Sequence, residues 1–476
     1  MSDRLASAAR SVAELLERLG VIDVEQLRPT IDLAWPRVVT GFAIMSKQTA
    51  DLAMVGLAVG ASAAAGLAFA YAYWGVAVFF GLGLAGGTVS LVSQNYGGGE
   101  TERAALVVKQ SILLGVAIAL PIVIAYGLFA ERLIGPLGGD PDAIGHGARY
   151  LTLVAPAVLF ELLNHIASRT YAGVGDTFTP MVARAGGALL NVGLSGALIF
   201  GAGMGVAGAA IGTTVSIAAV TLVLAWGMLG NEYGRLGMAV SPVPVDVRGQ
   251  WIAPTLARQL VEISTPLIAR RVAEGVVVFP LLWIAASFGP VVVAALEVGR
   301  RVRGVINSVR WGFSIASSTL VGQRLGADEE ADAGEYGAAI IRLTVVVYVG
   351  VALLVVAFST PIASLFVTDP EAVSQAAAFV VVGAISAVGL GIDGAATGAL
   401  RGAGDTRWPF VASLVGRYVF ALPVAAVGMV TPLGVAGLYL ALVLEAFVPG
   451  AVNVWLFRTG RWKAISRRYR PSTTPE

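Results

Sequence analysis

The sequence predicts an all-α membrane protein with 12 transmembrane helices in two pseudo-symmetric lobes of six helices each. Hydrophobic residues make up 57% of the 476 positions and charged residues only 13%, whereas soluble domains carry roughly 25% charged residues. Apolar runs of about 20 residues with few charges recur along the chain, and such runs are typical of transmembrane helices. The second half also repeats landmarks of the first half, which indicates a duplicated architecture.

The apolar runs place six expected helices in each half of the chain. In the first half they cover residues 31–59, 66–93, 104–130, 148–172, 178–201 and 205–229. In the second half they cover residues 258–287, 291–321, 336–359, 376–400, 407–430 and 434–457. Because six is an even number, both halves enter the membrane from the same side, as parallel repeats do in transporters.

Four landmarks recur at one constant offset of 229 residues. They are Gly175-Asp176-Thr177 with Gly404-Asp405-Thr406, Gln94 with Gln323, Asp140-Pro141 with Asp369-Pro370, and Gly205–Gly208 with Gly434–Gly437. Chance matches would scatter in their offset, so we interpret the pattern as an internal duplication.

Three further segments flank or join the lobes. The expected domains are residues 1–30 as an amphipathic N-terminal segment, 31–229 as the N-lobe, 230–257 as a cytoplasmic linker, 258–457 as the C-lobe and 458–476 as a basic cytoplasmic tail. The first segment mixes charged and apolar residues without a continuous apolar core, so it is not a signal peptide. Its apolar residues fall at helical spacing, which fits either a helix lying on the membrane surface or a solvated tail helix.

Basic residues are distributed unevenly between the two ends of the expected helices. One side carries the N-terminus, Arg103, Lys109, Arg169, Arg235, Arg248, Arg324, Arg401, Arg407 and the basic tail. Since basic loops stay in the cytoplasm, both termini are expected there, in a multi-pass protein of the cell membrane.

Several classes of function are excluded by missing residues. The chain has no cysteine and only two histidines, so disulfides, thiolate nucleophiles and zinc–thiolate sites are absent. No nucleotide-binding P-loop, zinc-protease or hydrolase motif occurs, and no basic, aromatic-rich surface for nucleic acids is visible. Gly81–Gly86 matches a dinucleotide-binding motif, but it lies in an apolar run with no strand before it. We therefore expect neither an enzyme nor an organic cofactor.

The chain resembles the multidrug and toxic compound extrusion (MATE) transporters over roughly residues 30–460. The features that carry the resemblance are Pro36 placed 15 residues before Asp51, the similar loops Tyr171–Thr177 and Leu400–Thr406, and Pro266 placed eight residues before Glu274. No one of these motifs is decisive, but the repeated set is specific to the family.

The resemblance implies a secondary antiporter. In such a protein a proton or a sodium ion enters while an amphipathic, often cationic, organic compound or drug leaves, by alternating access of the two lobes. Its other partner would be membrane lipid. The alternative is a flippase or exporter of a lipid-linked or anionic substrate, because related superfamily members share two such lobes. A channel fits a two-lobe duplication less well.

Asp51 is the first candidate for the coupling site, because a charge inside a membrane helix costs about 2.5–3.5 kcal/mol. The alternative role of Asp51 is an ion pair with Lys47, one turn away on the same face. By resemblance, Asn191 and Thr213 would join Asp51 in a polar cluster that binds a proton or a sodium ion. A second aspartate of the family is replaced by Ser195 here, which removes one anionic ligand.

Two acids of the C-lobe are candidates for coupling or substrate binding. Glu274 matches an acid of the bacterial members, and Arg270 and Arg271 offer it a structural ion pair instead. Asp393 lies one helical turn from the position of a further acid in the family. Its repeat partner is Asn164, which supports an inward-facing polar position in both lobes.

The expected helix 291–321 is rich in basic residues. Glu297, Arg300, Arg301 and Arg303 are expected near its outer end, where their side chains can snorkel. Arg310 lies deeper and should have an acidic partner, either Glu274 or Asp393. A C-lobe this rich in arginine makes an anionic or zwitterionic substrate more plausible.

His165 and Pro36 are the remaining candidates. His165 suits proton coupling by its ordinary pKa, or it is simply a buried, hydrogen-bonded histidine. Pro36 is expected to bend the first helix, either to shift Asp51 during coupling or as a fixed kink.

Overall fold

The computed structural model describes residues 2–137, 140–234 and 237–470, with side chains described from Arg10 onward. Arg235 and residues 471–476 of the expected basic tail lie outside these residues. The regular elements of the described chain are all helices. They form two compact units, which we call the N-unit (residues 36–268) and the C-unit (residues up to 35 together with residues from 269 onward).

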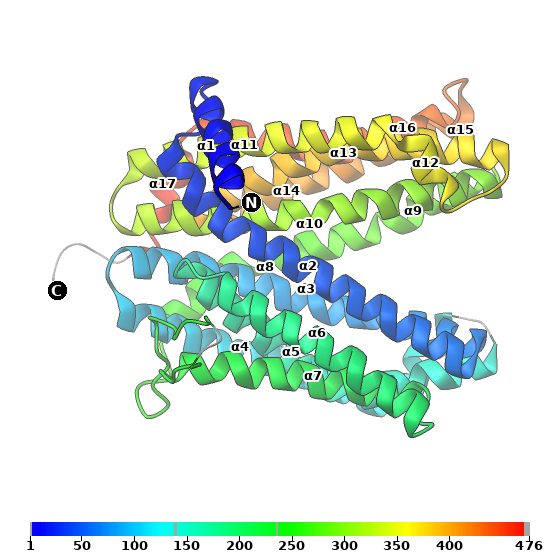
Figure 1. The fold of residues 1–476 in the computed structure, drawn as a ribbon, viewed down its shortest axis with the longest axis horizontal. Helices are drawn as coiled ribbons and strands as arrows, with labels where there is room; N and C mark the ends of the chain where they lie inside the picture. The colour runs from blue at the N-terminus through cyan, green and yellow to red at the C-terminus, as the bar shows by residue number, and fades with distance from the viewer. Residues whose placement is uncertain (1, 138–139, 235–236, 471–476) are drawn as a thin grey trace. The chain divides into compact units, whose positions relative to one another are not determined.

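The N-unit is a bundle built around α5 (Figure 1). Its complete helices are α3 (Ala61–Gly97), α4 (Thr101–Ile134), α5 (Pro141–Gly173), α6 (Phe178–Gly196) and α7 (Val206–Met228), with the 3-10 turn η1 (Gly135–Leu137) and the π-helix η2 (Ala197–Gly201). Because α5 packs against α3, α4 and α7, residues on several of its faces are buried.

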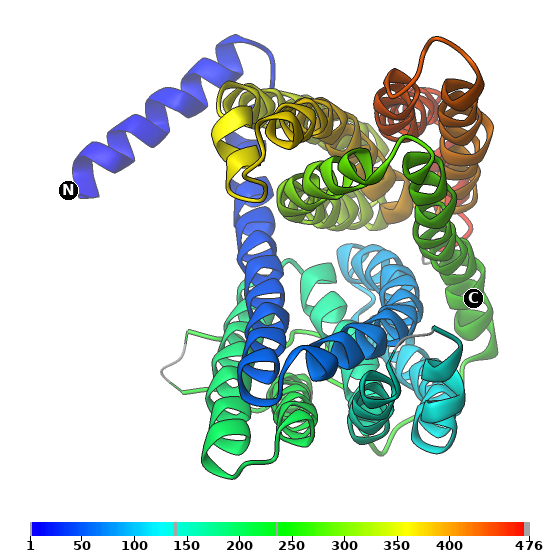
Figure 2. The same cartoon turned by 90° about the vertical axis from the view of Figure 1, so that its right-hand side faces the viewer.

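The C-unit has the same organisation around α13. Its helices are α1 (Ser2–Arg18), α9 (Val278–Ala286), α10 (Pro290–Gly326), α11 (Glu330–Ala357), α12 (Ser359–Ser364), α13 (Pro370–Gly402), α14 (Arg407–Leu414), the π-helix η3 (Val415–Ala421), α15 (Leu422–Val430), α16 (Ala436–Arg458) and α17 (Arg461–Ser466). The core helix α13 packs against α10, α11 and α16. Seen nearly end on, the helices of each unit lie side by side (Figure 2).

Two helices, α2 (Val24–Val59) and α8 (Pro254–Val276), contribute to both units. The division falls directly before Pro36 in α2 and after Ile268 in α8, close to Pro266. It therefore differs by several residues from the expected lobe boundaries at 31 and 258. The helix α2 continues through Pro36 without a break in its helical assignment.

The predicted duplication is visible in the helix bounds. The helices α3 and α10 begin and end 229 residues apart, and so do α5 and α13. In each unit these two helices meet at a pair of glycines, Gly66 with Gly147 and Gly299 with Gly383. A Cβ atom on Gly147 would lie 2.7 Å from the Gly66 carbonyl oxygen, so small residues let the helix backbones touch, as in many membrane bundles.

The described helices account for all the expected spans. Nine of them, or pairs of them in line, are long and apolar enough to cross a membrane. The other three expected spans coincide with α2, with α8 followed by α9, and with α10, where polar and ionisable side chains lower the mean hydropathy. The predicted fold class, two six-helix lobes of a membrane protein, is therefore confirmed.

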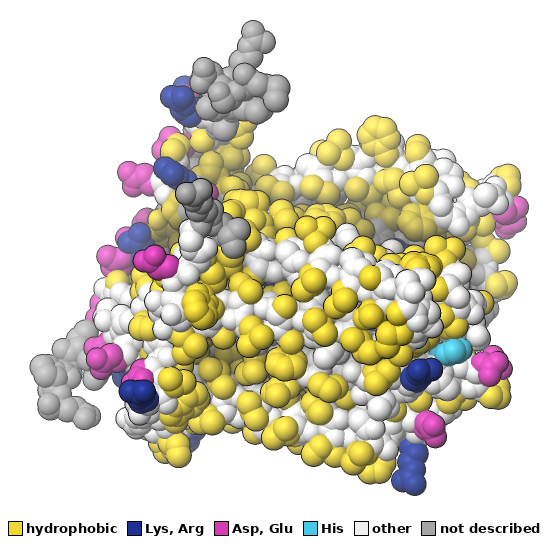
Figure 3. All heavy atoms as spheres, turned by 60° about the horizontal axis from the view of Figure 1, so that its bottom comes forward, with side chains coloured by type: hydrophobic (Ala, Val, Ile, Leu, Met, Phe, Trp, Pro, Cys, Tyr) yellow, Lys and Arg dark blue, Asp and Glu magenta, His cyan; other side chains and the backbone are white. Residues whose placement is uncertain are grey.

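Large apolar side chains on the outside of the bundle are exposed, among them Leu128, Leu189 and Leu222, with 75%, 76% and 67% of their surface accessible. On the face shown in Figure 3, hydrophobic side chains cover the middle and acidic and basic side chains gather at the two ends. A band of this kind is what the hydrocarbon core of a bilayer requires.

Candidate functional site

The N-unit surrounds one deeply buried carboxylate, that of Asp51, which is only 1% exposed. The Thr213 hydroxyl donates a hydrogen bond to Asp51 Oδ2 over 3.0 Å. The side chain of Asn191 lies 3.1 Å from Thr213 Oγ1 and 3.3 Å from Ser195 Oγ. With its amide group turned over, Asn191 donates to Asp51 Oδ1 over 3.3 Å. The structure thus brings the N-unit candidates Asp51, Asn191, Thr213 and Ser195 together.

The helices α2, α6 and α7 meet at this cluster because α7 has a glycine there. A Cβ atom on Gly212 would lie 3.0 Å from the backbone nitrogen of Ser195, so only glycine allows this approach. Tyr150 of α5 also contacts Thr213 and forms an edge-to-face pair with Tyr71, with ring centroids 5.8 Å apart. Sequence reasoning missed both tyrosines, because nothing distinguishes them from other aromatic residues in apolar helices.

Lys47 is not the partner of Asp51. The ion pairs among the described residues do not include one between these two side chains. Lys47 instead lines a cavity of about 50 Å³ together with Glu161, Asn164 and Arg184. Asn164 is therefore near a second polar group of the N-unit and not part of the Asp51 cluster.

This second group is centred on His165 of α5. His165 Nε2 lies 3.2 Å from Glu161 Oε1, and Nδ1 lies 3.2 Å from the Arg184 guanidinium. Arg184 also contacts Glu161 at 3.4 Å. His165 is thus the buried, hydrogen-bonded histidine of the simpler interpretation. The other histidine, His146, lies in α5 as well, so the expectation that His165 is the only helical histidine was wrong, because α5 begins seven residues earlier than the expected span at 148.

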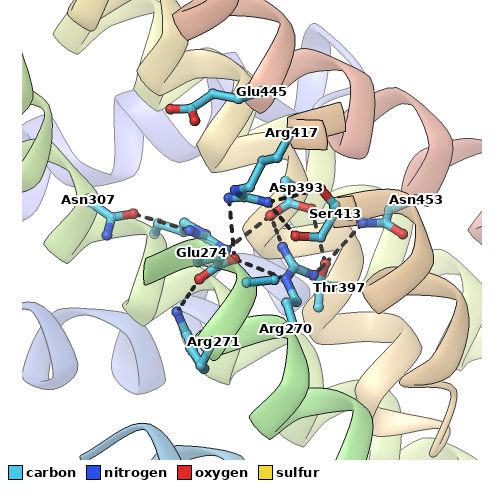
Figure 4. Close-up of polar contacts among 12 residues, drawn as sticks. Arg270, Arg271, Glu274, Asn307, Asp393, Thr397, Ser413, Arg417, Glu445 and Asn453 are labelled. Carbon is cyan, nitrogen blue, oxygen red and sulfur yellow. Dashed lines mark hydrogen bonds and ion pairs between the residues drawn. The ribbon is translucent and has the colours of Figure 1, made fainter. Parts of the chain in front are cut away.

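In the C-unit the two candidate acids share one arginine (Figure 4). The Arg270 guanidinium donates to Glu274 Oε1 over 3.1 Å and forms an ion pair with Asp393. Arg310 donates to the same Asp393 oxygen over 3.0 Å, which gives Arg310 the acidic partner expected for it. Asn453 donates to Asp393 Oδ1 over 2.8 Å, so both oxygens of this carboxylate are occupied.

Glu274 is held by three arginines. Besides Arg270, Arg271 lies 3.0 Å from Glu274 Oε2 and Arg417 lies 3.4 Å from Oε1, as Figure 4 shows. Arg417 projects from the π-helix η3 and also donates to Ser413 one turn earlier. The wider turn of a π-helix often accompanies functional side chains, and no local sequence signal announced it here.

The outer arginines of α10 line a pocket of about 360 Å³ within the C-unit. Arg303 forms an ion pair with the buried Glu445 of α16, and Arg300 pairs with Glu297 at 2.8 Å. The expectation that these side chains snorkel was therefore wrong for Arg303. A buried acid on a neighbouring helix holds it inside the bundle, and that acid is 142 residues away in sequence.

A duplicated bundle of apolar helices with ionisable side chains buried in both copies defines a membrane transporter. Comparisons with known proteins identify the kind. The MatE family model matches residues 36–195 and 266–427, more than half of the chain. The chain belongs to the MatE family, which confirms the resemblance found in the sequence. Because members of this family are transporters, the protein is a multi-pass transporter and not an enzyme.

Relatives span nearly the whole chain. The "Probable multidrug resistance protein NorM" of Bradyrhizobium diazoefficiens is 27% identical over 448 residues, which cover 90% of this chain and 92% of that protein. "Multidrug resistance protein PmpM" of Pseudomonas aeruginosa is 25% identical over 443 residues, covering 92% and 91%. The crystal structure titled "MATE in the bent conformation" has a TM-score of 0.84 at 18% identity and covers 93% of this chain and 97% of its own; it shows the fold.

Proposed function

We propose that this transporter is a secondary antiporter that exports organic compounds in exchange for protons or sodium ions, by alternating access of its two lobes. The observation that carries the proposal is the burial of Asp51 among neutral hydrogen-bonding side chains. No ion pair with a described residue neutralises this carboxylate. A proton or a sodium ion is the simplest partner for its charge.

The chemistry around Asp51 suits either ion. Thr213, Asn191 and Ser195 offer neutral oxygens beside the carboxylate, and hard cations prefer oxygen ligands. Buried carboxylates in transporters also serve as proton carriers. Asp51, Asn191 and Thr213 are thus our candidate sodium site, with Ser195 as an additional neutral ligand.

The acids of the C-unit are weaker candidates for the coupling step. Asp393 accepts hydrogen bonds from two arginines and Asn453, and Glu274 contacts three arginines. A coupling ion that enters there has to displace a guanidinium group from each carboxylate. We therefore assign coupling to the N-unit and treat Glu274 and Asp393 as residues that shape the C-unit.

The proposed substrates are amphipathic organic compounds, including drugs. This class follows from the names of the relatives, which are multidrug resistance proteins. A preference for cationic compounds is what the family resemblance implies, and it remains a prediction. We further propose that both termini lie in the cytoplasm, because basic residues gather on that side of the helices.

Transport in proteoliposomes tests the proposal. Rhodamine 123, a cation, and fluorescein, an anion, are loaded separately, and release is followed under an imposed sodium gradient or pH gradient. We expect one gradient to drive export of at least one dye, and Asp51→Asn to reduce that export to the rate without a gradient. Asp142→Asn is the matched control, because Asp142 is exposed in the first turn of α5. Export that ignores both gradients, or that survives in Asp51→Asn, contradicts the proposal.

The second candidate is a flippase or exporter of a lipid-linked or anionic substrate. The specific observation in its favour is the pocket of the C-unit, whose wall holds five arginines and three glutamates. Movement of fluorescein, or of a lipid-linked phosphate, without dependence on either ion gradient would favour this candidate.

A further inference from the structure

The pocket of the C-unit carries an excess of positive charge. Its wall includes five arginine and three glutamate side chains, which leaves a formal excess of two positive charges. All the lining residues belong to the C-unit, so one compact unit builds the whole pocket. Its volume of about 360 Å³ falls in the range of small-molecule sites.

The glutamates of the wall are already engaged. Glu445, with its side chain 5% exposed, pairs with Arg303, and Glu274, 15% exposed, lies 3.4 Å from Arg417. Only Glu297 is more open, at 42%, and it pairs with Arg300. The negative charge of the pocket is therefore consumed by ion pairs, and little of it is left to attract a cation.

Arg301 differs from the other arginines of the wall. It is exposed, and the ion pairs among the described residues do not include it. It lies within four residues of Arg300 and Arg303 on α10. A guanidinium group stays charged at all physiological pH values and offers paired donors that match a carboxylate or a phosphate.

We propose that this pocket binds an anionic group, a carboxylate or a phosphate, on the exported compound, and that Arg301 is the residue that receives it. The direction of transport rests on the proposed function, while the binding preference stands on the pocket alone. The inference narrows the substrates to acidic or zwitterionic compounds.

A zwitterion fits the remaining features of the wall. Exposed ion pairs contribute little to stability, so the pair between Arg300 and Glu297 can exchange partners with a ligand. The ligand's acid then contacts Arg300 and Arg301, and its amine contacts Glu297. Leu281 and Leu442, which also line the pocket, provide apolar surface for the body of the compound.

Equilibrium binding tests the preference without any gradient. Fluorescein and rhodamine 123 share one xanthene ring system and differ mainly in charge. Their fluorescence anisotropy is measured with the purified full chain in neutral detergent at low salt. We expect fluorescein to bind at least about tenfold more tightly, the size of one charge-assisted hydrogen bond. Added salt should reduce the difference.

Substitutions at Arg301 make the test specific. Arg301→Gln should weaken fluorescein binding by roughly tenfold, and Arg301→Lys should restore part of it, since lysine keeps the charge but loses the fork of donors. The control is Arg461→Gln, an exposed arginine of α17 that does not line the pocket. Equal binding of the two dyes, tighter binding of rhodamine 123, or unchanged fluorescein binding in Arg301→Gln overturns the proposal.

A phospholipid headgroup carries the same phosphate chemistry as a soluble compound. Mixed micelles with phosphatidylglycerol or with phosphatidylcholine distinguish the two sources. Displacement of fluorescein by phosphatidylglycerol alone supports the anion site and assigns it to a lipid headgroup, whereas no displacement supports the site and assigns it to a soluble acid. Failure of ion-driven export with intact, Arg301-dependent fluorescein binding would contradict the antiport proposal only.

Discussion

Asp51 of the N-unit and Asp393 of the C-unit are both buried carboxylates, but they have different partners. Asp51 accepts a hydrogen bond from the Thr213 hydroxyl, whereas Asp393 contacts Arg270 and Arg310. The helices that hold them repeat with the same bounds in the two units. Duplication therefore kept the scaffold while the electrostatics diverged, and the comparison separates a carboxylate available to an ion from one that is already neutralised.

The same divergence appears at one pair of repeat-related positions. Gly81 and His165 in the N-unit correspond to Arg310 and Gly394 in the C-unit, at the offset of 229. A Cβ atom on Gly81 would lie 3.0 Å from the His165 ring, and one on Gly394 would collide with the Arg310 side chain. The space between the two core helices is kept in both units, but a different helix fills it in each.

The largest effect is expected from Arg270→Ala. The substitution leaves the carboxylates of Asp393 and Glu274 with fewer counter-charges in a buried site, which costs about 3–5 kcal/mol. The melting temperature in detergent should fall well below that of the wild type. A companion variant that adds Asp393→Asn should recover part of the loss, because it removes one of the stranded charges. A loss below about 1 kcal/mol would mean that the arginine network does not hold the C-unit together.

The second effect concerns Asp405, in the loop between α13 and α14. Burial raises the pKa of this carboxyl group to about 6. Because the folded state binds the proton more tightly than the unfolded state, protonation stabilises the fold fully below pH about 4, and this contribution is lost as the pH rises through about 6. We expect about 1–3 kcal/mol less stability at pH 7 than at pH 4 from this group.

Asp405→Asn should abolish that dependence and make the protein more stable than the wild type above pH about 6. Melting curves recorded across this pH range check it. The repeat-related variant Asp176→Asn is the control, since Asp176 is only half-buried and accepts a hydrogen bond from the Thr179 amide over 2.9 Å. Identical pH profiles for the wild type and Asp405→Asn would be evidence against the effect of burial.

A smaller effect is expected from alanine at the two repeat-related glycines. Gly394→Ala pushes Arg310 away from its place beside Asp393 and should cost about 1–3 kcal/mol. Gly81→Ala meets only the ring of His165, and alanine favours the helix over glycine, so the net change should stay within about 1 kcal/mol. Denaturation of both variants in parallel measures the difference. Equal losses would show that the space is equally tight in the two units.

The smallest change in stability is expected for Asp51→Asn. The asparagine oxygen still accepts the hydrogen bond from Thr213, and no arginine loses a partner, so the free energy of unfolding should change by about 1 kcal/mol or less. Thermal unfolding of the same protein that is used for transport gives this value. A large loss would place Asp51 in the structural class of Asp393 and weaken its assignment to coupling.

Much of this fold could be predicted because apolar runs report burial in lipid directly. The expected spans coincide with the helices, and the 229-residue repeat recurs in the helix bounds. The Asp51 cluster could be anticipated because polar residues in such runs are rare. Asn191 and Thr213 therefore stood out, and the family resemblance brought them to Asp51.

The ion-pair partners could not be predicted, because they depend on how each helix is rotated against its neighbours. Glu445 was recognised as a buried acid, but its pairing with Arg303 links residues 142 positions apart. Glu161 gave no local signal of its contact with Arg184. The π-helix that presents Arg417 likewise follows from tertiary packing and not from any residue pattern.

The passage of α2 from one unit to the other affects how the protein is made. Val21 and Leu33, before the division, are buried in one core with Phe457 and Trp462 of the C-unit. The ribosome makes the first pair more than 400 residues before the second. Domains usually fold in the order of their synthesis, but the C-unit cannot complete its core that way. Its earliest strand of chain must wait in the membrane until the last helices have been inserted.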